Sequence, residues 1–249
     1  MTRPARLMPA EWAPHRATWL SWPHHEPDWP GKLGPIPWVY AEIVRVVAAH
    51  EPVEVLCHDE AVQESAGDAL LAHGVRLDRV RLHVVPTDRV WLRDSAPTSV
   101  IDAAGGVVLL DWAFNAWAKY DNFASDAAVG AEMARLTGLP RVEPTRPDSG
   151  APLVLEGGGI EVNGRGLVLV TEEWLLTDVQ VRNPGLGRAD YEQAFATWLG
   201  ATQTIWLGEG CVGDDTHGHI DDIARFVTPD TVVLAVEGDP SDDNHLRSQ

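Results

Sequence analysis

Three stretches of this sequence place acidic and imidazole side chains at regular intervals. Asp94 is followed 62 residues later by Glu156, and Glu156 is followed 63 residues later by His219. Asp221 lies two residues beyond His219, and we place both on one strand, where residues two apart face the same way. A structural unit repeated with this period would bring the polar positions to a common axis. We therefore predict that Asp94, Glu156, His219 and Asp221 form one site.

Carboxylates gathered around one histidine suit a planar guanidinium ligand. A guanidinium presents N–H donors in a fixed fork that matches carboxylates bidentately, and it stacks on aromatic faces such as that of Trp91. Two carboxylates would hold its nitrogens while its central carbon stays open to attack by a cysteine thiolate. The histidine would then protonate the departing ammonia and activate water. This combination predicts deimination of a guanidine.

Each of these residues alone also permits a structural interpretation. Asp94 could pair with the preceding arginine or cap a turn, and Glu156 could mark a bulge before three glycines. The spacing of His217, His219 and Asp221 is also compatible with a divalent metal site or with polar packing in the core. The shared interval favours a common site over these separate roles.

Helix-like and strand-like patterns alternate along the chain and would position these side chains. Apolar residues at helical spacing predict helices over residues 38–49 and 59–73. Short apolar runs predict strands over residues 53–57 and 81–85. This alternation is typical of the α/β class.

A hairpin is expected after each of the three polar positions. The paired strands are 96–101 with 107–112, 159–162 with 167–171, and 223–227 with 231–236. Gly, Asn and Pro between the paired strands supply the backbone angles that turns need. Helices over 124–137 and 188–199 follow the first two hairpins, and a strand over 203–207 follows the second. The order strand, strand, helix, strand predicts a ring or propeller of repeated units rather than an open sheet.

The composition limits the classes of partner. The 37 Asp and Glu residues outnumber 19 Lys and Arg, which leaves a net charge of -18 that repels nucleic acid and attracts small cations. We find no apolar run long enough to span a membrane, so no membrane partner is expected. The N-terminus shows no secretory pattern and two cysteines make no disulfide framework, so we expect a cytoplasmic protein. No linker composition divides the chain, and we expect a single domain over residues 1–249.

Several longer motifs together resemble one enzyme family. They are Met8-Pro-Ala-Glu-Trp12 with His15, Thr18-Trp-Leu-Ser-Trp-Pro23, Trp29-Pro-Gly31, Trp91-Leu-Arg-Asp-Ser-Ala-Pro97, Asp111-Trp-Ala-Phe-Asn115 with Trp117, Leu155-Glu-Gly-Gly-Gly-Ile-Glu161 and Asp214-Asp-Thr-His-Gly-His-Ile-Asp221. The chain resembles the agmatine deiminase and bacterial peptidylarginine deiminase family of the guanidino-group-modifying (pentein) superfamily. This resemblance implies an α/β-propeller of five ββαβ units, of which this chain would hold about four, with the last incomplete.

The resemblance also implies roles for the predicted site. Asp94 and Asp221 would grip the guanidinium, Glu156 would assist them, and His219 would be the acid and base. Trp91 would shape the guanidinium pocket. The reaction would need no cofactor and no metal, because a bound cation would compete with the guanidinium for the same carboxylates.

The nucleophile is the point at which this sequence departs from the family. The family carries its cysteine after a glycine-rich stretch near its C-terminus, whereas this chain has only Cys57 and Cys211. Neither matches that motif, and the glycines around Cys211 suggest a loop rather than a held thiol. We therefore expect a C-terminally truncated member that does not itself turn over guanidines.

The preferred substrate is agmatine, a small cationic guanidine of putrescine biosynthesis and polyamine metabolism. Its hydrolysis would give N-carbamoylputrescine and ammonia. Peptidyl or free arginine is the alternative substrate, and amidinotransfer is a second class of reaction. A non-catalytic guanidine-binding fragment, or pseudoenzyme, is the alternative outside the enzymes. Assembly into a homo-oligomer stays open.

Overall fold

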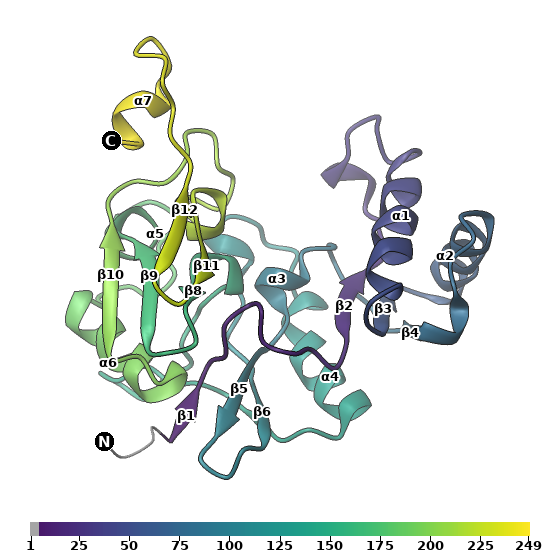
Figure 1. Ribbon diagram of the computed structural model, residues 1–249, viewed down its shortest axis with the longest axis horizontal. Coiled ribbons are helices and arrows are strands. Elements are labelled where there is room, and N and C mark those ends of the chain that lie inside the picture. The colour runs from purple at the N-terminus through teal and green to yellow at the C-terminus, as the bar shows by residue number, and fades with distance from the viewer. Residues whose placement is uncertain (1–4) are drawn as a thin grey trace. The chain divides into compact units, whose positions relative to one another are not determined.

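The computed structural model describes residues 5–249, which fall into two compact units (Figure 1). The first unit contains the N-terminal residues up to Ala13, Arg93–Asp121 and Met133–Gln249. The second unit contains Pro14–Leu92 and Asn122–Glu132. Each unit has its own sheets and its own apolar core, so the two are described in turn.

The second unit is built on a parallel sheet with the order β2-β3-β4. Its strands are Thr18–Ser21, Val53–Cys57 and Val80–Val84, and its helices are α1, Ile36–Ala48, and α2, Glu60–Ala72. All five residues of β3 are buried, as expected for the central strand of a parallel sheet, and the buried Glu54 pairs with Arg81 and His83 of β4. Asp59 caps α2, because its side chain accepts a hydrogen bond from the Val62 amide. The helices predicted over 38–49 and 59–73 and the strands predicted over 53–57 and 81–85 match these elements within two residues.

The first unit contains three separate sheets, and each includes an antiparallel hairpin. The hairpin strands are β5, Thr98–Asp102, with β6, Val107–Leu110; β8, Glu161–Val162, with β9, Leu167–Thr171; and β11, Ala224–Thr228, with β12, Thr231–Leu234. All three predicted hairpins are therefore present. Their first strands begin one or two residues later than expected, because short helical turns precede them.

Two of these hairpins gain a third strand that runs parallel to the second. The strand β7, Arg141–Val142, follows α4, Val129–Thr137, and pairs with β6. The strand β10, Gln203–Leu207, follows α6, Arg188–Leu199, and pairs with β9 (Figure 1). The remaining regular elements are β1, Arg6–Leu7, beside β5; α3, Leu92–Ser95; α5, Glu172–Leu176; and α7, Asn244–Arg247. The structure is thus a mixed α/β fold, as predicted.

The main core of the first unit packs directly behind the predicted site. Leu155 and Ile160 flank the glycine turn and are fully buried, together with Trp174 of α5 and Phe195 of α6. Burial of such large apolar side chains stabilises the unit and fixes the backbone on which the polar side chains stand. Within residues 5–249, no helix is both long and apolar enough to cross a membrane.

Candidate active site

Glu156 lies at the centre of a buried polar cluster in the first unit. It immediately precedes a 3₁₀ turn over Gly157–Gly159, and its side chain is completely buried. Its Oε2 accepts a hydrogen bond from Trp174 Nε1 at 2.8 Å and lies 3.3 Å from His219 Nε2. Its Oε1 accepts one from Arg182 Nε at 3.1 Å. A carboxylate so enclosed is held in one orientation by all of its partners.

Gly158 allows three of the predicted site residues to meet. A β-carbon at this position would lie 2.6 Å from His219 Nδ1, 2.7 Å from Asp94 Oδ1 and 2.9 Å from Asp221 Oδ2. No side chain fits there, and the Gly158 amide instead donates a hydrogen bond to Asp94 Oδ1 at 3.0 Å. The glycine turn therefore serves close approach, and the bulge interpretation of Glu156 is wrong.

His219 occupies the N-cap of a 3₁₀ turn over Ile220–Asp222, so its predicted place on a strand with Asp221 is wrong. The side chains converge nevertheless, because the turn brings Asp221 Oδ1 to 4.0 Å from His219 Nδ1. Asp94 Oδ1 lies 3.7 Å from the same nitrogen. Asp214 holds the preceding loop by accepting hydrogen bonds from the amides of Gly218 and His219. The structure thus brings the carboxylates of Asp94, Glu156 and Asp221 around the imidazole of His219.

Trp117 is a member of this cluster to which the sequence analysis gave no role. Its Nε1 donates to Asp94 Oδ2 at 3.1 Å, and its side chain is buried. The backbone of Ala116, Trp117 and Ala118 is left-handed, with φ between 49° and 60°, although none of the three is glycine. Such strain persists only where surrounding contacts enforce it, and Gln180 Nε2 contributes by donating to the Trp117 carbonyl. The aromatic motif around residue 115 was visible in the sequence, but its contact with Asp94 was not.

The four central residues shift one another's pKa values through their charges. Burial raises the pKa of Asp94 to about 6 and also raises the pKa of Asp221, while the His219 charge opposes both shifts. Burial disfavours the Glu156 carboxylate too, but its hydrogen bond to His219 and the charge of Arg182 outweigh burial and lower its pKa. Burial disfavours the His219 imidazolium, yet Glu156, Asp94 and Asp221 outweigh that effect and raise its pKa.

Known proteins are similar to this chain in sequence and in fold. The family model described as Porphyromonas-type peptidyl-arginine deiminase matches residues 7–249. The chain belongs to this family. It is 37% identical to the agmatine deiminase of Stutzerimonas stutzeri (strain A1501) over 246 residues. That alignment covers 97% of this chain and 63% of the relative, so the chain spans less than two thirds of the relative's length.

Solved structures agree with this family membership. The agmatine deiminase of Enterococcus faecalis matches with a TM-score of 0.86 and 25% identity, over 98% of this chain and 64% of that one. A C. jejuni agmatine deiminase with substrate bound matches with a TM-score of 0.83 and 28% identity, over 97% of this chain and 68% of that one. The mixed α/β fold is therefore that of agmatine deiminase structures.

The sequence analysis also singled out Trp91 for the guanidinium pocket and His217 for the alternative metal site. Trp91 belongs to the second unit, where its ring centroid lies 5.8 Å from that of Trp29, and its place in a guanidinium pocket stays a prediction. His217 faces Glu173 and Thr177: its Nδ1 lies 3.8 Å from Glu173 Oε1, and its Nε2 lies 3.1 Å from Thr177 Oγ1. In the described part of the chain, no group of three or more His, Cys, Asp or Glu residues could hold a metal ion.

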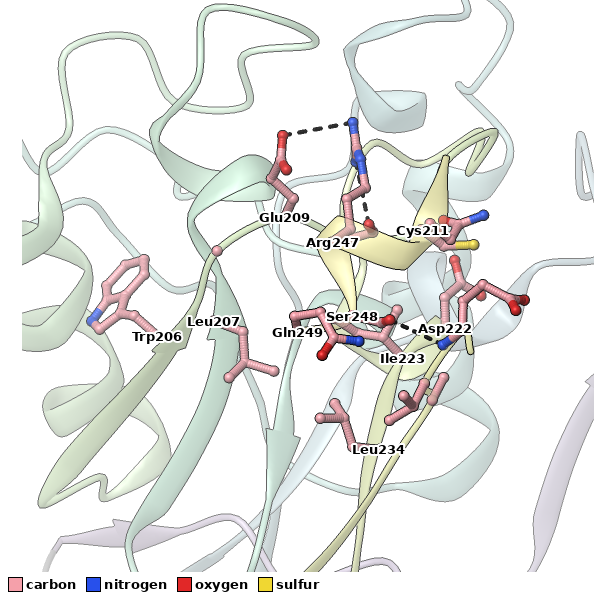
Figure 2. Close-up of a pocket in the computed structure, with 16 residues that line it drawn as sticks. Trp206, Leu207, Glu209, Cys211, Asp222, Ile223, Leu234, Arg247, Ser248 and Gln249 are labelled. Atoms are coloured by element: carbon pink, nitrogen blue, oxygen red, sulfur yellow. Dashed lines mark hydrogen bonds and ion pairs between the residues drawn. The ribbon is translucent and has the colours of Figure 1, made fainter. Parts of the chain in front are cut away.

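The two thiols of the chain are those of Cys57 and Cys211. Cys57 is buried in β3 of the second unit, where burial raises its pKa to about 12. Cys211 lines a pocket of about 480 Å³ beside β10, β12 and α7 (Figure 2). Its Sγ donates to the carbonyl of Val212. The lining of that pocket includes Asp222 but none of the four central residues.

Proposed function

We propose that this chain carries the guanidine-binding and acid–base groups of an agmatine deiminase-type hydrolase that acts on C–N bonds of amidines. The observation that carries the proposal is the convergence of three carboxylates on one imidazole around Gly158. Family membership and the likeness to agmatine deiminases support it. The net charge of -18 favours a small cation over nucleic acid as the partner.

The carboxylates of Asp94 and Asp221 are suited to take the substrate. Each has oxygen lone pairs beyond those used by its present partners, and a guanidinium offers N–H donors in a matching plane. Glu156 is fully buried and saturated by Trp174, Arg182 and His219, so it acts on the substrate through His219. A guanidinium bound between the two aspartates would also stabilise their ionised forms, which burial disfavours.

The proposed reaction adds water to agmatine and releases ammonia. A thiolate attacks the guanidinium carbon, and a C–N bond breaks as His219 protonates the departing ammonia. Water, deprotonated by the same imidazole, then attacks the thiouronium carbon, the C–S bond breaks, and N-carbamoylputrescine leaves. Every step uses protein side chains and water, so we propose no cofactor and no metal. The same geometry would serve peptidyl or free arginine, the alternative substrate.

The thiolate is the group that this chain does not supply at the cluster. Burial makes the Cys57 thiol too basic to supply a thiolate, and Cys211 Sγ donates to the carbonyl of the next residue, Val212. We therefore propose that the 249-residue chain binds guanidines without turning them over, in a cytoplasmic setting. We also propose that its hairpin–helix–strand order belongs to a ring of repeated ββαβ units.

Thermal unfolding with two matched ligands tests the proposed function. Agmatine should raise the Tm of the chain more than putrescine does, because putrescine has an amine where agmatine has the guanidinium. Equal shifts, or none, would contradict guanidine recognition. A parallel assay for N-carbamoylputrescine should find no product. Product formation that is lost in Cys211→Ser would make Cys211 the nucleophile, whereas formation unaffected by that change would overturn the thiol mechanism.

A further inference from the structure

Arg182 is a cation buried completely in the interior of the first unit. Its guanidinium donates to Glu156 Oε1 at 3.1 Å, to the Gln180 carbonyl at 2.8 Å and to the Thr216 carbonyl at 2.5 Å. Its side chain and that of Glu156 both have no exposed surface. Arg182 is therefore committed to protein partners and cannot bind a ligand from solvent. Its function must be exerted through the groups that it touches.

Glu156 is the group through which Arg182 can act. A buried carboxylate without a cation partner takes up a proton, because desolvation disfavours the charged form. Trp174 contributes a neutral N–H to Oε2, while Arg182 contributes both an N–H and a full positive charge to Oε1. Arg182 is thus a permanently charged partner that, together with His219, keeps Glu156 ionised.

The protonation state of Glu156 determines whether His219 is charged, because Glu156 is one of three carboxylates around the imidazole. Glu156 Oε2 faces Nε2 of the imidazole, while Asp94 and Asp221 face Nδ1 from the other side. The Trp174 ring also lies against the imidazole, with centroids 5.6 Å apart and the rings nearly perpendicular, and it carries no charge. Glu156 Oε2 lies within hydrogen-bond distance of Nε2, and the carboxylates of Asp94 and Asp221 lie 3.7 and 4.0 Å from Nδ1, so their negative charges stabilise the imidazole with both nitrogens protonated. A protonated Glu156 would remove the acceptor at Nε2 and leave a neutral imidazole.

We propose that Arg182 is a positioning residue that acts through Glu156: its buried guanidinium fixes Glu156 as a carboxylate, and this carboxylate holds His219 as an imidazolium. The role in ammonia release rests on the proposed function, whereas the effect on the proton of His219 does not. The carboxylates of Asp94, Glu156 and Asp221 then face the cations of His219 and Arg182, and the charges of Arg93 and Arg225 also act on Asp221. In the resting site His219 therefore already carries the proton that it would donate to the departing ammonia.

The experiment is a ¹⁵N NMR measurement of the His219 ring, assigned by comparison with His219→Gln. Imidazolium and neutral tautomers give distinct ¹⁵N shifts, so the readout is the protonation state itself. In the wild-type chain both nitrogens should be protonated near neutral pH. In Arg182→Gln the proton should move to Glu156, and the ratio of imidazolium to neutral imidazole at a given pH should fall about tenfold, the change that one pKa unit produces. Arg182→Lys, which keeps a cation beside Glu156, should restore most of the His219 imidazolium.

Arg146→Gln is the matched control. Arg146 lies in the same unit and donates to Asp148 and to the Pro184 carbonyl, away from Glu156. Its removal should leave the ¹⁵N shifts of His219 unchanged. A folded Arg182→Gln chain with an unchanged His219 imidazolium would overturn the proposal.

A second pair of variants decides the matter if Arg182→Gln does not fold. In Glu156→Gln the unpaired Arg182 charge should repel the imidazolium, and adding Arg182→Gln should partly restore it. The same substitution thus has opposite effects in the two backgrounds, which a packing role alone would not produce. Absence of restoration would overturn the proposal. Agmatine binding is measured separately, so its absence would refute the proposed function and leave the result for Arg182 unaffected.

Discussion

Two buried or half-buried histidines of this chain carry opposite electrostatic environments. His219 in the first unit is surrounded by Asp94, Glu156 and Asp221, and its pKa is raised despite deep burial. His24 in the second unit is held by the carbonyls of Trp22 and Thr87, and it stacks on the His58 ring with centroids 4.5 Å apart. Burial and the neighbouring His58 lower its pKa, although both carbonyls oppose that shift.

This difference teaches that burial alone does not decide the charge of a histidine. Desolvation disfavours the imidazolium in both places, but only the first unit supplies carboxylates that compensate it. The compensating charges come at a cost, because Asp94 and Asp221 are themselves held out of water with raised pKa values. The carboxylates around His219 suit a cationic ligand. The pair of His24 and His58 in the second unit has no such arrangement of carboxylates around it in the described residues.

The largest expected effect concerns the stability of the unliganded site. The pKa of Asp94 is raised from 3.8 to about 6, so protonation favours the folded state. The unfolding free energy therefore falls as pH rises through this window, by roughly 3 kcal/mol, and stays lowered above it. Asp94→Asn should remove that penalty and lose about 1 kcal/mol for one hydrogen bond. We expect urea unfolding to show a net gain of about 2 kcal/mol near neutral pH.

Asp126→Asn in the second unit is the matched comparison. Burial raises the pKa of Asp126 to about 6 as well, and its Oδ1 accepts hydrogen bonds from the amides of Asp88 and Arg89. The contribution of Asp126 to the unfolding free energy should fall as pH rises, in the same direction as that of Asp94. Agmatine should nevertheless stabilise Asp126→Asn as strongly as it stabilises the wild-type chain. A loss of stability in Asp94→Asn at neutral pH would show that Asp94 is not electrostatically strained.

Gly158→Ala should weaken guanidine binding by about 10- to 100-fold, the equivalent of roughly 1.4 to 2.7 kcal/mol. The added methyl group would overlap His219, Asp94 and Asp221 and force them apart. Gly208→Ala is the control, because a β-carbon there meets nothing within 4 Å and no positive φ is required. Competition of agmatine against a fluorescent guanidine measures both variants. Equal affinities would mean that the three side chains do not act together on the ligand.

The two histidines should respond to pH with opposite signs. His219 has a raised pKa, so its contribution to stability is present below about 6.5 and is lost as pH rises through the raised value. His24 has a lowered pKa, so stability is lost as pH falls below about 6.5 toward the lowered value. Urea unfolding of His219→Gln and His24→Gln across this range should give differences from wild type with opposite slopes. Slopes of the same sign would contradict the comparison.

The smallest effect is expected for Trp117→Phe. This change removes the hydrogen bond to Asp94 Oδ2 and keeps an aromatic ring, so agmatine affinity should fall about fivefold, the equivalent of roughly 1 kcal/mol. Trp206→Phe is the control, because its indole N–H also donates to a carboxylate, that of Glu192, in the same unit. If the two variants bind agmatine alike, Trp117 does not orient Asp94.

Much of the fold could be predicted because its signals are local. Apolar periodicity marked α1 and α2, and turn residues marked all three hairpins. The helix predicted over 124–137 was only partly right, because its start is a 3₁₀ turn over Asp126–Ala128 followed by α4. The pairing of β1 with β5 joins residues almost a hundred positions apart, and no local pattern indicates it.

The site was predictable only as far as its repeat and its family motifs reached. These brought out Asp94, Glu156, His219 and Asp221, although His219 begins a 3₁₀ turn rather than lying on a strand. Arg182 fell outside the repeat and outside every motif quoted, so its contact with Glu156 required the three-dimensional structure. A buried ion pair leaves no mark in a single sequence unless its two residues share a recognisable spacing.

The central claim is that the cluster around Gly158 recognises a guanidinium by charge. Calorimetric titration of the 249-residue chain with agmatine, beside Asp94→Asn and Asp126→Asn, tests it most directly. We expect saturable one-to-one binding to the wild-type and Asp126→Asn chains and at least a roughly 30-fold loss in Asp94→Asn, as removal of one partner of a buried charge pair produces. No binding to the folded wild-type chain, or equal binding to Asp94→Asn, would contradict the account.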